Sequence, residues 1–175
     1  LNVVVGNNST AVDSAGIEAE RLGYSHAMIS GNPEDNSAEA VGRHLATTAR
    51  SIHESDGPDC LITGGESTVE LAAETVRGRG GRNQQVALAA LEELSDWTSL
   101  ALLSGGTDGE DGPTDAAGAI VDEEIALAAQ AARLDTADYL ARDDAYHFFE
   151  QCDGLFKTGP TGTNVCDLRV VCVGK

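Results

Sequence analysis

Short runs rich in β-branched and apolar residues alternate with helical stretches through the first third of the chain. The runs expected to be strands are residues 1–5, 26–29 and 60–63. A helix is expected to end near Leu22, with Ser9 or Thr10 as its N-cap, and a second is expected from Ser37 to about Ser55. This alternation predicts a mostly parallel β-sheet with helices packed on its faces.

The pattern changes after residue 66. β-type residues within 67–77 predict a hairpin. A helix is expected to begin at Arg82 and to continue to Leu94, and its apolar residues from Val86 onward predict that it is well buried. Strands are expected at 100–103, 116–121 and 167–173, and helices at 123–132 and 143–151. Together these segments predict an α/β protein with three layers, α/β/α, around a mixed sheet.

Acidic residues far outnumber basic ones. The chain holds 29 Asp and Glu against 11 Lys and Arg, a formal net charge of -18, and only two of the basic residues are lysine. A hydrophobic content of 41% indicates a folded core, so the charge belongs to the surface. Such a surface is typical of a salt-adapted, cytoplasmic protein, because dissolved salt screens the repulsion. It argues against nucleic-acid binding, which requires a basic patch.

The cysteines do not predict a metal site or a disulfide framework. Cys60, Cys152, Cys166 and Cys172 have no CxxC spacing, so four reduced thiols are expected. No signal peptide or long apolar run is recognised in these residues, and neither secretion nor membrane association is expected.

Two glycine-rich loops carry the residues best suited to chemistry. Residues 77–82 combine glycine with arginine before a predicted helix, and a helix N-terminus beside arginine attracts anions. Residues 104–115 combine glycine with aspartate after a predicted strand, where acidic side chains hold a hard cation or accept a proton. Neither loop matches the dinucleotide fingerprint, the phosphate-binding P-loop or the EF-hand. Together they predict a polar small-molecule site that handles phosphate or carboxylate.

Four ordered motifs resemble the MOFRL family, the C-terminal domain of glycerate 2-kinases that are also named hydroxypyruvate reductases. The motifs are GGESTV at 64–69, GGRNQ at 80–84, SGGTDG at 104–109 followed by DGPTDAAG at 111–118, and TGPTGTNV at 158–165. The resemblance implies a MOFRL-like domain over residues 56–175, preceded by a strand–helix–strand–helix segment over residues 1–55. A larger N-terminal catalytic domain, expected to belong to a longer parent protein, is not contained in this chain.

The resemblance also implies an activity and a set of site residues. Family members phosphorylate D-glycerate at the 2-hydroxyl with ATP and a divalent metal, here expected to be Mg²⁺, in a cleft between the two domains. Arg82 and Asp108 correspond to the family's catalytic residues, and Asp111 and Asp115 are expected to bind the metal or shape the loop. The residues expected to bind substrate or phosphate are Glu66, Gly80, Gly81, Asn83, Gly105, Gly106, Thr107, Thr161 and Asn164.

The sequence departs from the family pattern at two places and leaves alternatives open. Gln85 stands where the family usually has glutamate, and the stretch 70–75 is longer than the usual hairpin. One alternative is an NAD(P)H-dependent hydroxypyruvate reductase, although the dinucleotide fingerprint is missing. Another is a folded module that is inactive when separated from the N-terminal domain. The expected partners are D-glycerate and that domain, and a homodimer remains open.

Overall fold

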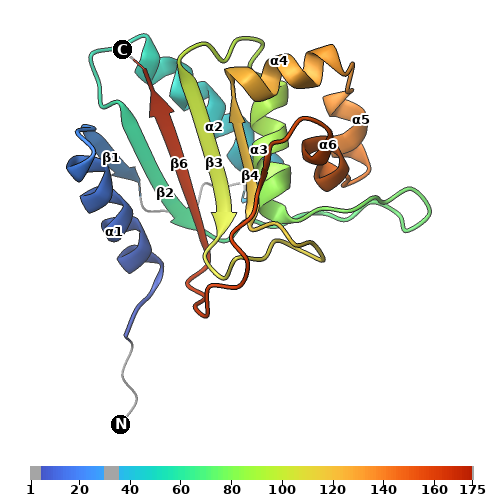
Figure 1. The fold of residues 1–175 in the computed structure, drawn as a ribbon, viewed down its shortest axis with the longest axis horizontal. Helices are drawn as coiled ribbons and strands as arrows, with labels where there is room; N and C mark the ends of the chain where they lie inside the picture. Colours follow the sequence, from blue (N-terminus) through green and yellow to red (C-terminus); the bar gives the residue numbers. More distant parts are fainter. Residues whose placement is uncertain (1–4, 30–35, 175) are drawn as a thin grey trace.

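A mixed six-stranded sheet forms the centre of the protein (Figure 1). The computed structural model describes residues 5–29 and 36–174. In these ranges the strands are β1 (His26–Ile29), β2 (Cys60–Gly65), β3 (Leu100–Gly106), β4 (Gly118–Asp122), β5 (Leu155–Phe156) and β6 (Asp167–Val173). Their order across the sheet is β1-β2-β6-β3-β4-β5.

The last strand occupies the middle of the sheet. β6 runs antiparallel to both of its neighbours, β2 and β3, and β4 is antiparallel to β3 and β5. Only β1 and β2 pair in parallel. The mixed sheet is therefore confirmed, whereas the expectation of mostly parallel pairing is wrong. It was extended from the strand–helix alternation of the first third, but β6 enters between β2 and β3 in the opposite direction, and β4 runs antiparallel to both of its neighbours.

Helices cover both faces of the sheet, which confirms the three-layer α/β/α fold. They are α1 (Asn8–Arg21), α2 (Ala38–His53), α3 (Arg82–Glu93), α4 (Glu123–Ala131), α5 (Thr136–Ala141) and α6 (Ala145–Gln151). Ile62 packs with α1, while its neighbour Leu61 packs into the large core that contains α2 and α3. Because successive strand residues point to opposite faces, α1 lies on one face and α2 and α3 on the other (Figure 1).

Side chains that precede α1 and α2 accept hydrogen bonds from backbone amides in the first turn of each helix. Asn7, rather than Ser9 or Thr10, is the N-cap of α1: its side-chain oxygen accepts from the Thr10 amide at 3.0 Å. Ser37 caps α2, as its position before the helix indicates, by accepting from the Ala40 amide.

The stretch 67–77 does not form the predicted hairpin. It projects as a long two-limbed loop (Figure 1) and contains one isolated bridge, between Thr68 and Ser37, but no ladder between its own limbs. Its anchors lie elsewhere: the Ala72 amide donates to Asp143 Oδ2 at 2.6 Å, and the Gly78 amide donates to the Arg142 carbonyl at 2.7 Å. The loop is thus anchored to residues 142 and 143 and not by pairing between its own limbs.

Other elements agree with the sequence to within a few residues. The strand predicted at 167–173 and the helices beginning at Arg82 and Glu123 are confirmed. The short elements α5 and β5 were not predicted. The strand expected at 1–5 lies, apart from Val5, outside the described residues. Within the described ranges, no helix combines the length and apolarity that crossing a bilayer requires.

Candidate functional site

A polar pocket of about 480 Å³ opens where the ends of β2 and β3 meet the start of α3. Its walls come from the loop after β2, the glycine segment before α3, the loop after β3 and the segment before β6. The lining residues are Glu66, Ser67, Val69, Leu71, Gly80, Gly81, Arg82, Gln85, Asp108, Glu110, Asp111, Gly112, Pro113, Asp143 and Asn164. Two loops that the sequence singled out, near Arg82 and near Asp108, therefore share one pocket.

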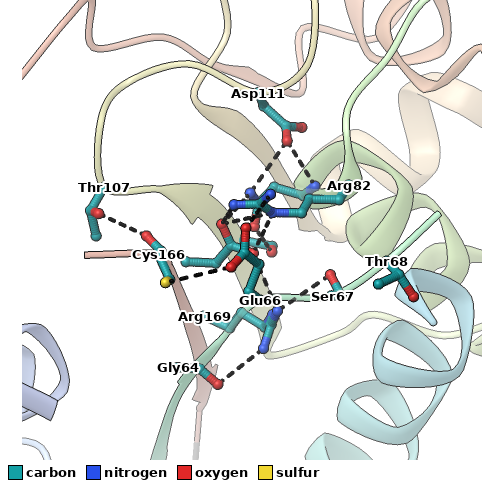
Figure 2. Close-up of polar contacts among 12 residues, drawn as sticks. Gly64, Glu66, Ser67, Thr68, Arg82, Thr107, Asp111, Cys166 and Arg169 are labelled. Atoms are coloured by element: carbon teal, nitrogen blue, oxygen red, sulfur yellow. Dashed lines mark hydrogen bonds and ion pairs between the residues drawn. The ribbon is translucent and has the colours of Figure 1, made fainter. Parts of the chain in front are cut away.

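Arg82 is the central side chain of the site (Figure 2). It is the first residue of α3, and its guanidinium donates from Nε to Asp167 Oδ2 at 2.8 Å and from Nη2 to Asp167 Oδ1 at 2.9 Å. Its Nη1 lies 3.0 Å from Glu66 Oε1. These bonds, first of all those to Asp167, raise the pKa of Arg82 above its ordinary value. The two-pronged pairing fixes the plane of the guanidinium.

The carboxylate that holds Arg82 is completely buried. Asp167 has no exposed side-chain surface and also accepts from Asn83 Nδ2 at 3.0 Å. Arg169 approaches it at 3.5 Å and donates to the Gly64 carbonyl at 3.2 Å. Burial lowers the pKa of Arg169. Two guanidinium groups therefore share one buried carboxylate, and Glu66 is the second carboxylate that pairs with Arg82.

Asp111 caps the helix that carries Arg82. The N-cap position is Gly81, which has no side chain, and Asp111 accepts from the backbone amides of Asn83 at 3.0 Å and Gln84 at 2.8 Å. Only 3% of Asp111 is exposed, and this burial raises its pKa to about 6, against the opposing effect of the two amides. The carboxylate belongs to the loop after β3, so the loop and the helix start are built as one unit.

The structure does not bring Asp111 and Asp115 together as metal ligands. Asp115 accepts instead from Tyr146 Oη at 2.8 Å and Lys157 Nζ at 2.9 Å, and the Lys157 bond lowers its pKa. Among the residues that the structure describes, no three or more acidic, histidine or cysteine side chains form a group able to hold a metal ion. Within the described ranges, the carboxylates therefore do not by themselves form a ligand set for Mg²⁺.

Asp108 lies on the pocket wall and joins two loops. Its Oδ2 accepts from Asn164 Nδ2 at 3.0 Å, and its carbonyl accepts from the Thr161 amide at 3.0 Å. Thr161 Oγ1 also donates to the Thr107 carbonyl at 2.5 Å. Thr107 and Thr161 thus fasten the segment before β6 onto the loop after β3. As a result Asn164 and Asp108 reach the pocket side by side.

The predicted glycines fall into two groups. A Cβ added to Gly81 would lie 2.3 Å from Asp111 Cγ, and a Cβ on Gly112 would lie 2.4 Å from the Gly80 carbonyl oxygen. Glycine there permits the two loops to touch along their backbones. Gly105 and Gly106 are the last residues of β3 and are not among the described residues that line the pocket. The Gly106 amide donates to Ala117 at 2.8 Å, so it does not serve a ligand.

Gln85 shows why this chain departs from the family pattern. Its side-chain amide donates to Glu39 Oε1 at 3.1 Å, to the Leu140 carbonyl at 3.1 Å and to Asp143 Oδ1 at 3.3 Å. All three partners are acceptors. An ionised glutamate at this position has no donor to offer them and would add a third carboxylate.

Asp167 and Arg169 are the important site residues that the sequence reasoning missed. Alternation in the sequence pointed the other way, because positions 168, 170 and 172 are all apolar and would be assigned to the buried face. In the structure residues 167, 169, 171 and 173 are the buried set. The two charged members of that set pair with each other, and Asp167 also pairs with Arg82.

The fold and the site define an α/β protein whose arginine-centred polar pocket lies at one edge of a mixed sheet. The chain belongs to the MOFRL family, whose model matches residues 59–167. A glycerate kinase from Macaca fascicularis is 37% identical over 217 residues, which cover 98% of this chain and 54% of that protein. A D-glycerate 2-kinase from Thermotoga maritima is 38% identical over 171 residues, which cover 95% of this chain and 40% of that protein.

Solved structures agree with this assignment. The crystal structure of a glycerate kinase from Thermotoga maritima matches with a TM-score of 0.91 and 37% identity, over 98% of this chain and 42% of that one. The PH0495 protein from Pyrococcus horikoshii matches with a TM-score of 0.91 and 32% identity. The chain therefore spans about half or less of the length of these relatives.

Proposed function

We propose that the chain is the C-terminal part of a glycerate 2-kinase, which transfers a phosphoryl group from ATP to the 2-hydroxyl of D-glycerate. Relatives named glycerate kinase and D-glycerate 2-kinase cover nearly all of this chain and support the proposal. In this proposal residues 1–55 precede a MOFRL domain at 56–175, and the reaction takes place between the pocket and an N-terminal domain of the same protein.

The observation that carries the proposal is the way Arg82 is held. Its Nε and Nη2 are fixed by the buried Asp167, whereas Nη1 meets the exposed carboxylate of Glu66. An incoming carboxylate or phosphoryl oxygen can displace Glu66 from Nη1 without breaking the buried pair. Arg82 then binds the D-glycerate carboxylate or the transferring phosphoryl group in a fixed orientation.

Asp108 is suited to position the substrate hydroxyl. Its carboxylate stands on the pocket wall with one oxygen bonded to Asn164, which sets its direction. In phosphoryl transfer a carboxylate commonly orients the attacking hydroxyl and accepts its proton. Asp111 acts indirectly: it caps the start of α3, the helix from which the Arg82 side chain extends.

The deciding experiment is an assay of the full-length protein with ATP, magnesium and D-glycerate in high KCl, with the product resolved as 2- or 3-phosphoglycerate. Formation of 2-phosphoglycerate supports the proposal. No phosphorylation, together with NAD(P)H-dependent reduction of hydroxypyruvate, would overturn it in favour of the reductase. The isolated chain, which lacks the other wall of the cleft, is expected to be inactive.

Variants separate the role of Arg82 from general effects of lost charge. Arg82→Ala is expected to lower turnover by roughly 100-fold or more, as for the loss of a group that stabilises transition-state charge. Arg82→Lys keeps the charge but loses the two-pronged pairing and is expected to recover little. Arg43→Ala is the matched control, because Arg43 is exposed and pairs with Glu92 away from the pocket. Near-normal turnover in Arg82→Ala would refute the assigned role.

A further inference from the structure

Two cysteines face each other across the centre of the sheet. Cys60, at the start of β2, and Cys172, near the end of β6, are direct partners in the antiparallel ladder between these strands, which run side by side in Figure 1. Both are free thiols. They lie 112 positions apart in the sequence, so their spacing gave no indication of this contact.

The hydrogen bonds next to the pair define its geometry. The Val173 amide donates to the Asp59 carbonyl at 2.8 Å, and these two residues continue the register of the ladder by one step. They therefore form a hydrogen-bonded pair, and the next pair, Cys60 and Cys172, is a non-hydrogen-bonded one. In agreement, the Cys60 amide donates at 3.0 Å to Ser25, on the side away from β6. Residues in such pairs have Cα atoms about 4.5 Å apart, within the range that a disulfide spans.

The two thiols differ in environment. Cys60 is only 2% exposed and packs with Val12 and Ile62 beneath α1. Cys172 is half-buried and lines a surface pocket of about 340 Å³. The Cys60 thiol donates to the Cys172 sulfur, which lowers the pKa of Cys172 and raises that of Cys60. Cys172 is thus the accessible member with more thiolate character, and Cys60 is the buried member positioned to attack next.

We propose that Cys60 and Cys172 form a site of reversible oxidation, at which hydrogen peroxide joins β2 to β6 through a cross-strand disulfide. The Cys172 thiolate attacks a peroxide oxygen; an S–O bond forms, the O–O bond breaks, and the released hydroxide takes up a proton to become water. The Cys60 sulfur then attacks the Cys172 sulfenic acid. The S–O bond breaks, the hydroxide leaves with the Cys60 proton as a second water, and the S–S bond forms. Two thiols lose two electrons, and one peroxide gains them.

The remaining cysteines provide internal controls. Cys152 is buried within contact of the Phe148 carbonyl, and burial raises its pKa to about 11. Cys166 lies in the loop before β6, where its sulfur faces Glu66 Oε2 at 3.8 Å. Burial and this carboxylate raise the pKa of Cys166. Neither residue has a cysteine as its partner in the β-ladders of the structure.

The test is mass spectrometry of the protein after treatment with hydrogen peroxide and alkylation of the remaining thiols. The expected result is a loss of two hydrogens, two unalkylated cysteines and a cross-linked peptide that joins position 60 to position 172. Cys152→Ala and Cys166→Ala should keep this cross-link. Cys60→Ser, whose hydroxyl can still donate to the Cys172 sulfur, should lose it and leave a sulfenic acid at Cys172 that dimedone traps. Four alkylated thiols, or a cross-link that includes Cys166, would overturn the proposal.

Thermal melting gives a second, independent measurement. A disulfide between positions 60 and 172 closes a loop of roughly 110 residues, and a loop of this length is expected to raise the melting midpoint by roughly 10 °C. The increase should disappear after reduction with dithiothreitol and should be absent from the Cys60→Ala, Cys172→Ala double variant. Equal midpoints of the oxidised and reduced wild-type protein would contradict the proposed geometry.

Discussion

Replacing Asp167 with asparagine tests the buried charge cluster beneath the pocket. The change preserves the shape of the side chain but removes the negative charge that Arg82 and Arg169 share. Arg169 is only 4% exposed and cannot turn toward water. Breaking a buried ion pair by removing one partner costs about 3 to 5 kcal/mol. The lower end applies, since the asparagine oxygen still accepts one hydrogen bond and Arg82 remains one-third exposed.

A loss of about 3 kcal/mol should lower the melting midpoint by roughly 6 to 12 °C for a chain of this size. The assay is thermal unfolding followed by circular dichroism at one fixed KCl concentration. Asp13→Asn is the matched control, because Asp13 is exposed on α1 and the substitution changes the net charge of -18 by the same amount. If the melting midpoint of Asp167→Asn equals that of the control, the charge of the buried carboxylate does not stabilise the fold.

Three further results are expected. Because burial raises the pKa of Asp111 from 3.8 to about 6, the stability that its protonation contributes is complete below about pH 4 and is lost as the pH rises through 6. The free energy of unfolding of wild type minus that of Asp111→Asn, measured with urea, should therefore fall by roughly 3 kcal/mol between pH 4 and pH 7. A difference that does not change with pH would contradict this. Gly81→Ala places a Cβ 2.3 Å from Asp111 Cγ, whereas the Cβ of Gly80→Ala comes no closer than 3.3 Å, to the Ala145 amide nitrogen. Gly81→Ala should therefore lower the melting midpoint by several degrees more than Gly80→Ala. Equal effects would show that the loops adjust freely. With its charge of -18, the protein should also gain at least several degrees in midpoint between low and molar KCl, and a salt-independent midpoint would exclude salt adaptation.

Local signals in the sequence were sufficient for most of the elements. The apolar stretch after Arg82 predicted a buried helix, and its residues 83–91 are all buried. The strand predicted at 167–173 matches β6 at both ends. The stretch 67–77 failed because β-type residues form strands only where a partner strand exists. Its anchor, Asp143, lies 71 positions away from Ala72 and cannot be identified from spacing.

The candidate site was predictable as a set of loops but not as a set of contacts. The motifs placed Arg82 and Asp108 near one another, and they line the same pocket. The pairing of Arg82 with Asp167 joins residues 85 positions apart, and it depends on β6 entering the middle of the sheet. Strand order is a property of the whole fold, so no local pattern could assign that partner.

The cap of α3 has a consequence for how the protein folds. A helix that begins at Gly81 has no side chain of its own to hold its first turn, and the carboxylate that does so comes from Asp111, 28 positions beyond Asn83. The first turn, and with it the orientation of Arg82, is therefore completed only after β3 and the following loop have docked. We therefore expect local formation of α3 and maturation of the pocket to be separate kinetic events, with the closure of the non-local contact as the slower one.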